Sequence, residues 1–380
     1  MRQFICILSA FALLIGCVKI DPTTTTGQES EAVIAFESPI VDKKAKSVAE
    51  YKIYPDTLNF RVWGYYTEIE TATLSNSQTM YMNGAEFGKD GDTWGSVGKD
   101  YYWPKNGYLN FVAYAPARIS LTVQQPTITD QGTLQLGKYI VPNAADEDFL
   151  VSEVKYACTK PVVEGAGAPL SPLLFHHVLS SVAFKANSAI YGDREDDDTE
   201  RIDTDLRITR IEILNVRSRG TFSINLQNNS TSWIVPALPT LQKDFVGYDS
   251  DGGTGVELTD ELQFCHDKQI DPEDEATLSL TNLFLLPQQI LDDVTLQVTY
   301  DMTHTNLKDD GGNQVWIKDQ VKTVQVNQCG VTKWLRGHRY IYHISLGLNK
   351  IQCSAEVSDW STTDITTDVE DLDVEDVVEL

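Results

Sequence analysis

Three short segments carry side chains that could bind a metal ion. Asp90–Asp92 and Asp249–Gly253 begin with the acidic spacing of a calcium loop, and His176-His177 is an adjacent pair of imidazoles. A calcium loop of the EF-hand kind needs further ligands at its fifth and twelfth positions. Counted from Asp90, these positions are Trp94 and Tyr101, so we interpret the segment as a plain turn.

The remaining chemistry-bearing patterns predict no enzyme. Neighbouring residues on a strand point to opposite faces, so His176 and His177 are not expected to share one metal ion. The sequence has no HExxH spacing, P-loop, GxGxxG or GxSxG motif. A pair of catalytic carboxylates remains an alternative among the 55 acidic residues, because its geometry is set in space. We therefore predict no catalytic residue, no metal and no cofactor.

An aromatic cluster offers two interpretations. Trp94, Tyr101, Tyr102, Trp103 and Tyr108 fall close together in the chain. Exposed rings would stack on sugars and make Trp94, Tyr101 and Trp103 ligand-binding residues, whereas buried rings would be core packing. Packing is favoured, because Trp103 and the proline after it lead directly into an alternating strand pattern.

The first residues carry the chemistry of a lipid anchor. Arg2 is followed by an apolar run from Phe4 to Ile15, which is too short to span a bilayer and is typical of a secretory signal. The run ends in Leu-Ile-Gly-Cys at 14–17, which resembles a bacterial lipobox. The sequence therefore predicts a lipoprotein signal peptide at 1–16 and lipidation of Cys17.

The net charge and the cysteine spacing limit the kinds of partner and metal site that we expect. The 380 residues have a net charge of −25, so binding to nucleic acid is not expected, and a covalent lipid would have to hold the chain on a membrane. Cys158, Cys265, Cys329 and Cys353 include no CxxC pair, so no zinc or thioredoxin-type site is indicated. An exported location permits disulfides, but buried free thiols are an equal alternative.

The elements that must position these residues are strands. Period-two patterns recur without interleaved helical periods and predict an all-β protein of sandwiches. We expect a tether at 17–31, an N-terminal sandwich at 32–167, a C-terminal sandwich at 168–360 and an acidic tail at 361–380. The predicted strands centre on residues 108–113, 181–186, 222–226, 296–302, 340–348 and 351–357.

Four segments together resemble the fimbrillin family, the subunits of type V pili in Bacteroidetes and related surface lipoproteins. The first runs from Tyr101 to Pro116, and the second from Leu174 to Phe184. The third is Leu283–Gln288, and the fourth joins Trp334 and Tyr340–Tyr342 to Val357–Trp360. Their order and the lipobox make the combination specific over residues 17–360.

The resemblance implies two tandem transthyretin-like β-sandwich domains and an outer-membrane, cell-surface location. It also implies that a protease removes the first strand, so that a strand of the next subunit fills the groove. The family's protease cuts after arginine, yet no arginine lies between Cys17 and Arg61. Arg61 lies in a predicted strand, and Lys46 lies in a softer segment, so both are candidate processing sites.

The tail leaves its own alternatives open. Its apolar residues alternate only in part, so 361–380 is either a donor strand or a solvated acidic segment. We predict a structural or accessory subunit of fimbriae in cell adhesion, whose partners are other pilus subunits, the outer membrane, and a host protein or glycan. The alternative is a non-polymerising surface lipoprotein that binds glycans or other ligands.

Overall fold

The fold is all-β, as the sequence predicts. The computed structural model describes residues 32–42, 51–70, 74–75, 77–119, 126–129, 132–161, 169–189, 204–226, 228, 230–236, 238–258, 262–264, 282–347, 350–359 and 377–379. Within these ranges the helical elements are two three-residue 3-10 turns, η1 (Pro239–Leu241) and η2 (Val326–Gln328). Every predicted strand centre coincides with a strand of the structure.

The largest sheet contains most of the N-terminal half. Its strands are β1 (Ala35–Phe36), β2 (Ile40–Asp42), β3 (Tyr51–Ile53), β4 (Phe60–Thr67), β5 (Thr79–Asp90), β6 (Thr93–Ser96), β7 (Tyr108–Ala115), β10 (Leu150–Ser152), β11 (Lys155–Cys158) and β12 (Leu174–His177). They follow the order β1-β6-β5-β4-β7-β10-β12-β2-β3, and β11 also pairs with β7. Strands from the start of the chain therefore lie at both ends of the sheet.

Two sheets form the body of the C-terminal half. One has the order β19-β13-β25-β26, with β20 also on β13, and the other has the order β17-β14-β22-β23, with β18 also on β14. The bounds are β13 (Ser180–Ser188), β14 (Thr204–Arg217), β17 (Gln242–Asp249), β18 (Val256–Glu257), β19 (Leu262–Phe264), β20 (Leu283–Leu285), β22 (Thr295–Lys308), β23 (Gln314–Gln325), β25 (His338–Leu346) and β26 (Ile351–Asp359).

A further sheet joins segments from both halves of the chain. Its order is β27-β16-β15-β9-β8, and a separate pair is β21-β24. The bounds are β8 (Thr127–Ile128), β9 (Thr133–Ile140), β15 (Arg219–Asn225), β16 (Thr231–Val235), β21 (Gln288–Gln289), β24 (Lys333–Trp334) and β27 (Val377–Glu379). Because β9 pairs with β15 over its whole length, this sheet crosses the boundary that we place at 167/168.

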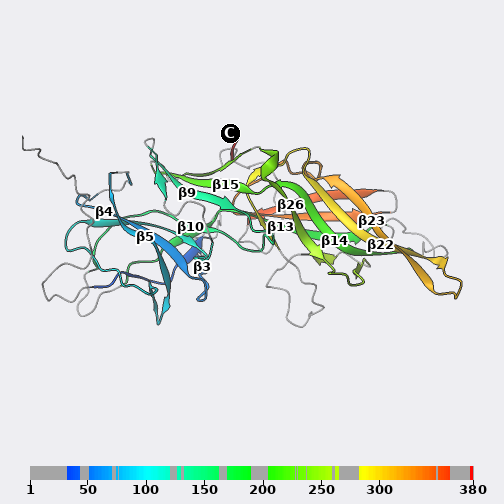
Figure 1. Ribbon diagram of the computed structural model, residues 1–380, viewed down its shortest axis with the longest axis horizontal. Helices are drawn as coiled ribbons and strands as arrows, with labels where there is room; N and C mark the ends of the chain where they lie inside the picture. Colours follow the sequence, from blue (N-terminus) through cyan, green and yellow to red (C-terminus); the bar gives the residue numbers. More distant parts are fainter. Residues whose placement is uncertain are drawn as a thin grey trace, which may run out of the picture.

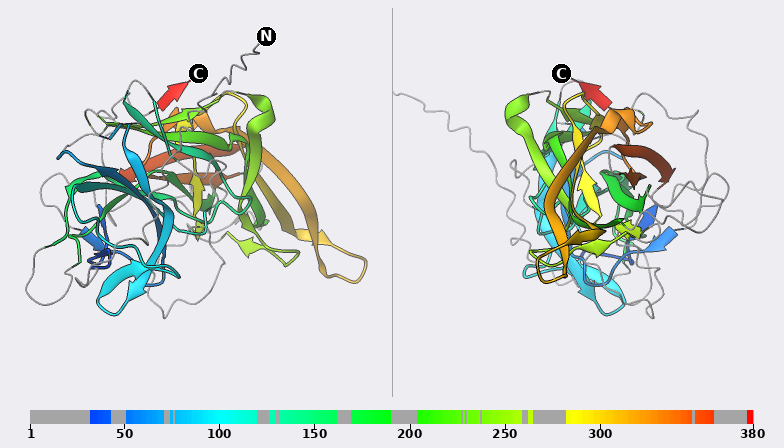
Figure 2. Two further views of the ribbon diagram at one scale, coloured as in Figure 1. Left: turned by 60° about the vertical axis from the view of Figure 1, so that its left-hand side comes forward. Right: turned by 90° about the vertical axis from the view of Figure 1, so that its right-hand side faces the viewer.

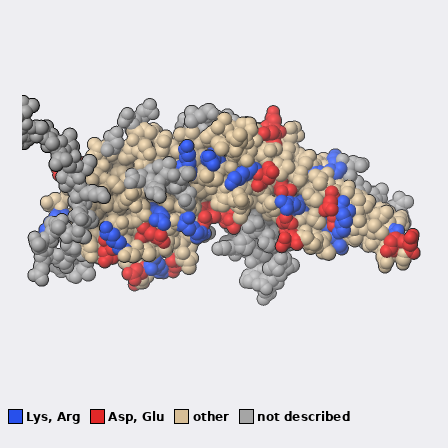
Figure 3. Space-filling model, viewed as in Figure 1, with Lys and Arg blue, Asp and Glu red and all other residues tan. Residues whose placement is uncertain are grey.

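The molecule is elongated, with the large N-terminal sheet at one end and the β22–β23 hairpin at the other (Figure 1). The hairpin projects from the body, as the turned views make clear (Figure 2). Acidic and basic side chains are interspersed over the visible face (Figure 3). The division into two transthyretin-like domains stays a prediction, and β12, which lies beyond our boundary, pairs with the N-terminal sheet.

Two hydrophobic cores lie on opposite faces of the N-terminal sheet. Leu109, Phe111 and Ala113 of β7 belong to the first core, which the large sheet itself encloses. Val112 and Tyr114 of the same strand belong to the second core, which extends through the C-terminal half. The alternating side chains of β7 therefore face two different buried cores, and neither face of the strand is exposed to solvent.

Gly107 gives a test of the turn that enters β7. Its φ is +82°, and a Cβ there would lie 2.6 Å from the Thr67 carbonyl oxygen and 2.7 Å from the Tyr66 ring. We expect Gly107→Ala to lower the free energy of unfolding by roughly 2–3 kcal/mol, measured by urea denaturation. Gly91, at φ +61° with no atom within 4 Å of an added Cβ, is the control. Gly91→Ala should cost about 1 kcal/mol, and equal losses would contradict the predicted contact.

Candidate assembly surface

The N-terminal segment 32–42 joins the two ends of the large sheet. β1 pairs with β6 through Ala35↔Gly95 and Phe36↔Trp94, and β2 pairs in parallel with β12 through Ile40↔Leu174. Between these pairings, the Leu170 amide donates a hydrogen bond of 2.8 Å to the Ala35 carbonyl. A single stretch of chain therefore closes the sheet around the first core.

The side chains of this segment fill that core. Ile34 and Phe36 have no exposed surface, and Val41 is 4% exposed. The Phe36 ring meets Phe87 and Phe111 edge-on, with centroid distances of 5.2 and 5.4 Å. Removal of the segment would leave both a set of unpaired backbone groups and an apolar slot, which are the two features that an incoming strand recognises.

Arg61, a candidate processing site, lies within the large sheet in the folded chain. It lies in β4, where it pairs with Glu86 of β5 on one side and Tyr114 of β7 on the other. Its guanidinium Nε donates to the Ala117 carbonyl at 2.8 Å and its Nη1 to the Gly84 carbonyl at 3.1 Å, and Nη2 lies 3.3 Å from the Glu86 carboxylate.

Proteases bind an extended strand whose backbone is unpaired, and cleavage concentrates at exposed, unpaired loops. A residue paired on both sides in the middle of a sheet does not meet this condition in the folded chain. Processing at Arg61 stays a prediction that would require β4 to open. Lys46 and Cys17 lie outside the described residues.

The last described residues form a strand, β27, at the edge of a sheet. β27 pairs in parallel with β16 through Trp233↔Val377, Ile234↔Val378 and Val235↔Glu379. It forms the edge of its sheet, where Figure 2 shows it as the terminal red strand. The last residues of the chain can therefore add to a sheet edge as a strand, here within their own chain.

The two tryptophans proposed for ligand binding are core residues. Trp94 is 1% exposed and packs against Tyr54 and Phe60, with ring centroids 5.3 and 5.5 Å apart. Trp103 is 9% exposed and meets Phe111 edge-on at 6.2 Å. A ring without an exposed face cannot stack on a sugar, so the glycan hypothesis is corrected for both residues.

Tyr101 differs from the two tryptophans. Its side chain is half-buried, and the Lys99 ammonium lies 5.5 Å from the centre of its ring. The carbonyl of Tyr101 accepts a hydrogen bond of 2.7 Å from the Ile34 amide, so its backbone helps to hold the N-terminal segment. The three aromatic residues therefore do not form one binding face.

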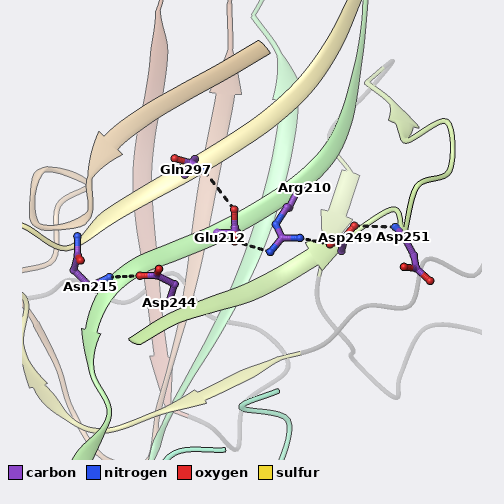
Figure 4. Close-up of polar contacts among 7 residues, drawn as sticks. All are labelled: Arg210, Glu212, Asn215, Asp244, Asp249, Asp251 and Gln297. Carbon is purple, nitrogen blue, oxygen red and sulfur yellow. Dashed lines mark hydrogen bonds and ion pairs between the residues drawn. The ribbon is translucent and has the colours of Figure 1, made fainter. Parts of the chain in front are cut away.

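The acidic loops are occupied by contacts within the protein. Asp249 binds the Arg210 guanidinium through one carboxylate oxygen and accepts the Asp251 amide at 2.8 Å through the other. Arg210 also contacts Glu212 at 2.7 Å, so one cation bridges two strands (Figure 4). At the other loop, Asp90 pairs with Thr93 across a tight turn. Both segments act as turns.

The adjacent histidines bind different carboxylates. His176 Nε2 lies 3.1 Å from Glu153, and His177 Nδ1 lies 2.6 Å from Asp148. The hydrogen bond from His176 and its charge lower the pKa of Glu153, against the opposing effect of burial. In the part of the chain that the structure describes, no group of three or more His, Cys, Asp or Glu side chains could hold a metal ion.

A cavity of about 190 Å³ lies between the N-terminal sheet and the sheet of β15 and β16. Val151, Glu153 and His176 line one side, and Phe222 and Thr231 line the other. This space lies beside β16, the strand on which β27 is seated. It is therefore an amphipathic recess, with apolar and charged walls, near the start of β16.

A protein-family model decides the identity of the chain. The fimbrillin-like model matches residues 56–360. The chain is a member of the fimbrillin-like family. This membership places the protein among fimbrial and cell-adhesion proteins, which are structural proteins of the cell surface.

The chain is also similar to solved structures of proteins from Bacteroides species. A fimbrial protein from Bacteroides vulgatus is 14% identical, with 86% of this chain and 99% of that chain covered and a TM-score of 0.47. A protein of Bacteroides uniformis assigned to cell adhesion is 13% identical, with 88% and 100% covered and a TM-score of 0.47. A search of curated proteins found no match.

The described residues include no helix that is long and apolar enough to cross a membrane.

Sequence reasoning missed that the N-terminal segment 32–42 closes the large sheet. The signal was present in Ile34, Phe36 and Val41, which are apolar residues close to a predicted tether. Their partners lie too far along the chain for a local pattern to identify them.

Proposed function

We propose that this fimbrillin-like protein is a structural or accessory subunit of type V pili, lipidated at Cys17, carried to the outer membrane and assembled by strand exchange. The supporting observation is segment 32–42, which contains β1 and β2 and whose side chains Ile34, Phe36 and Val41 fill the first core. Its adhesion partner would be a host protein or a glycan.

The physical basis is replacement of one strand by another. Loss of segment 32–42 would free the backbone groups of β6 and β12 that now pair with β1 and β2. A strand from a second copy would restore these hydrogen bonds and fill the same slot. Such a contact uses different surfaces on the two copies, so it does not close and produces a filament.

The acidic tail 361–380 is the proposed donor. Its last described residues already pair as a parallel strand with β16, so the tail has the capacity to join a sheet edge. In a filament, the tail would leave this position and enter the slot of the next copy. The alternative of a solvated tail would leave assembly independent of these residues.

Processing would occur between the removable and the retained strands. Residues 43–50 separate β2 from β3 and include Lys43, Lys44 and Lys46. Cleavage there would release both the lipidated Cys17 and segment 32–42. A subunit that is not cleaved would stay on the membrane as the anchor of the fibre.

We expect controlled cleavage of this segment to trigger assembly. A recognition sequence for a site-specific protease is inserted within residues 43–50, and size-exclusion chromatography with light scattering follows the full chain before and after cutting. The cut chain should lose segment 32–42 and form heterogeneous polymers, whereas the uncut chain should stay monomeric. Deletion of 361–380 should abolish polymers of the cut chain.

A matched control places the same recognition sequence in the turn between β22 and β23, at residues 309–313, where cutting removes no strand. This nicked chain should remain monomeric. A chain cut at 43–50 that releases segment 32–42 and stays monomeric would contradict strand exchange. Unchanged polymer yield without 361–380 would assign the donor strand to another segment.

The N-terminus of the native protein tests processing separately. Mass spectrometry of protein from cell membranes and from sheared surface fibres should find acylated Cys17 in the first and a terminus within 43–50 in the second. Acylated Cys17 in every fibre subunit would contradict the cleavage model. A terminus at Val62, which follows Arg61, would require unfolding of β4 before cleavage.

A further inference from the structure

The cavity of about 190 Å³ lies where three parts of the fold meet. β10 and β12 of the large sheet border it on one side, and β15 and the start of β16 border it on the other. Arg336, in the segment before β25, completes its lining. Small-molecule sites favour such junctions between packed units, because side chains from separate elements converge there.

The floor of the cavity is apolar. It is lined by Val151, Val178, Phe222 and Ile224, each of which is at most 4% exposed. These residues belong to the second core, so the cavity reaches into that core. A cavity of about 150 Å³ lined by aliphatic and aromatic side chains is large enough to bind benzene. The floor can therefore accept an apolar body of that size.

A buried hydroxyl in the lining of the cavity needs a partner. Thr231 lies at the start of β16, and its Oγ1 is buried without a hydrogen-bond partner among the described residues. A buried hydroxyl that makes no hydrogen bond destabilises the folded state. A molecule in the cavity can supply the missing bond, since a hydroxyl both donates and accepts.

The rim of the cavity is charged. Arg336 is half-buried, and the His176 and Glu153 side chains are 24% and 60% exposed, so these groups lie nearer to solvent than the floor. His176 Nε2 lies 3.1 Å from Glu153 and binds its carboxylate. A guanidinium carries five N–H donors, so Arg336 can bind a ligand carboxylate in addition to its contacts within the protein.

We propose that this cavity is a binding site for a small carboxylate with an apolar body. The apolar body occupies the floor, between the walls that Val178 and Phe222 provide. The ligand carboxylate pairs with the Arg336 guanidinium at the rim, and the Thr231 hydroxyl forms a hydrogen bond with the ligand. The ligand thereby bridges the large sheet and the sheet of β15 and β16. This proposal is independent of strand exchange.

The charges of the rim favour a carboxylate over an amine. A ligand ammonium would meet the Arg336 guanidinium as a like charge. Its attractive partner would be Glu153, whose carboxylate is already bound by His176 and is largely exposed to water. The same exposure weakens the repulsion between Glu153 and a ligand carboxylate, because water screens the charge.

Calorimetric titration of the full chain with 3-phenylpropionate tests the site. This probe joins a benzene ring to a carboxylate through a short alkyl spacer. We expect a dissociation constant of roughly 0.1–1 mM and a melting temperature that rises with the concentration of the probe. The matched 3-phenylpropionamide has the same apolar body without the charge, and should bind at least about tenfold more weakly.

An arginine substitution with a matched control tests the rim. Arg336→Gln should weaken binding of the carboxylate at least about tenfold and leave binding of the amide unchanged. Arg207→Gln removes the same group from β14, outside the lining of the cavity, and should bind both probes as the unsubstituted chain does.

Thr231→Val tests the hydroxyl, because valine keeps the shape of the side chain. The melting temperature of the ligand-free variant should stay the same or rise, while the carboxylate should bind about 3–10-fold more weakly. Unchanged affinity in this variant would remove Thr231 from the site.

The unsubstituted chain decides the case even if a variant fails to fold. Absence of binding at about 10 mM 3-phenylpropionate would overturn the proposal, because the affinity would then lie well below the expected range. Equal affinities for the acid and the amide would overturn it as well, as would equal losses in Arg336→Gln and Arg207→Gln.

Discussion

Replacement of Phe36 by alanine is expected to lower the free energy of unfolding by about 3–5 kcal/mol, among the largest effects of any single substitution in this chain. Phe36 has no exposed surface, and its ring contacts Phe60, Phe87 and Phe111 at centroid distances of 6.1, 5.2 and 5.4 Å. The variant would lose both the burial of the ring and three edge-to-face contacts. Urea denaturation of the uncleaved chain measures the loss.

An exposed apolar residue gives the matched control. Ile69 is 74% exposed, so Ile69→Ala should change the free energy of unfolding by less than about 0.5 kcal/mol. A loss below about 1 kcal/mol for Phe36→Ala would mean that segment 32–42 contributes little to the first core. It would also remove the slot on which the proposed strand exchange depends.

The second large effect is expected at Trp233, which connects the sheet of β15 and β16 to the centre of the molecule. The ring has no exposed surface, packs on Phe222 at 5.4 Å and donates a hydrogen bond of 2.5 Å from Nε1 to the Val178 carbonyl. Trp233→Ala should destabilise the chain by about 3–5 kcal/mol, measured by thermal and urea unfolding.

Trp233→Phe separates the hydrogen bond from the packing. It keeps most of the apolar volume but leaves the Val178 carbonyl without this donor, so we expect a loss of about 1–3 kcal/mol. The conservative substitution Phe222→Leu tests the neighbouring ring without loss of a polar group. Equal losses for Trp233→Phe and Trp233→Ala would show that the hydrogen bond dominates, which would contradict the expected order.

Strand positions could be predicted from the sequence because their signal is local. Val182, Phe184 and Ala186 of β13 face the second core, while Ala183 faces Ile341 on the other side, as their alternation predicts. In the same way Ile351, Cys353, Ala355 and Val357 of β26 pack against the second core. An alternation with period two predicts which face of a strand is buried, even when the partner strand is not known.

Partners could not be predicted, because pairing is a property of distant segments. The union of β9 with β15 connects residues 133–140 to 219–225 across the boundary that composition suggested. Arg61 has a similar explanation. It was a candidate because the protease of the resembling family cuts after arginine, whereas the carbonyls of Gly84 and Ala117 and the Glu86 carboxylate bind its guanidinium within the sheet.

In the candidate site, too, local packing could be predicted from the sequence, whereas pairing between distant segments could not. Packing was the favoured interpretation of the aromatic cluster, because Trp103 leads into a strand, and its two tryptophans are buried in the core. Sequence reasoning could not show that Trp94 lies opposite Phe36, since that register is set by residues far from both. The closing role of segment 32–42, and the seat of β27 on β16, depend on such registers and appear only in three dimensions.

The first strands of the chain close the large sheet, and this affects the order in which the protein folds during synthesis. A chain is synthesised from its N-terminus, so Ile34, Phe36 and Val41 emerge before any partner exists. β2 finds its parallel neighbour only when Leu174 and Phe175 have appeared. Contacts between such distant residues form slowly, and an unpaired apolar strand is prone to aggregation meanwhile. Segment 32–42 is thus synthesised early but folds late, and we expect it to need protection from other chains until the middle of the sequence has been made.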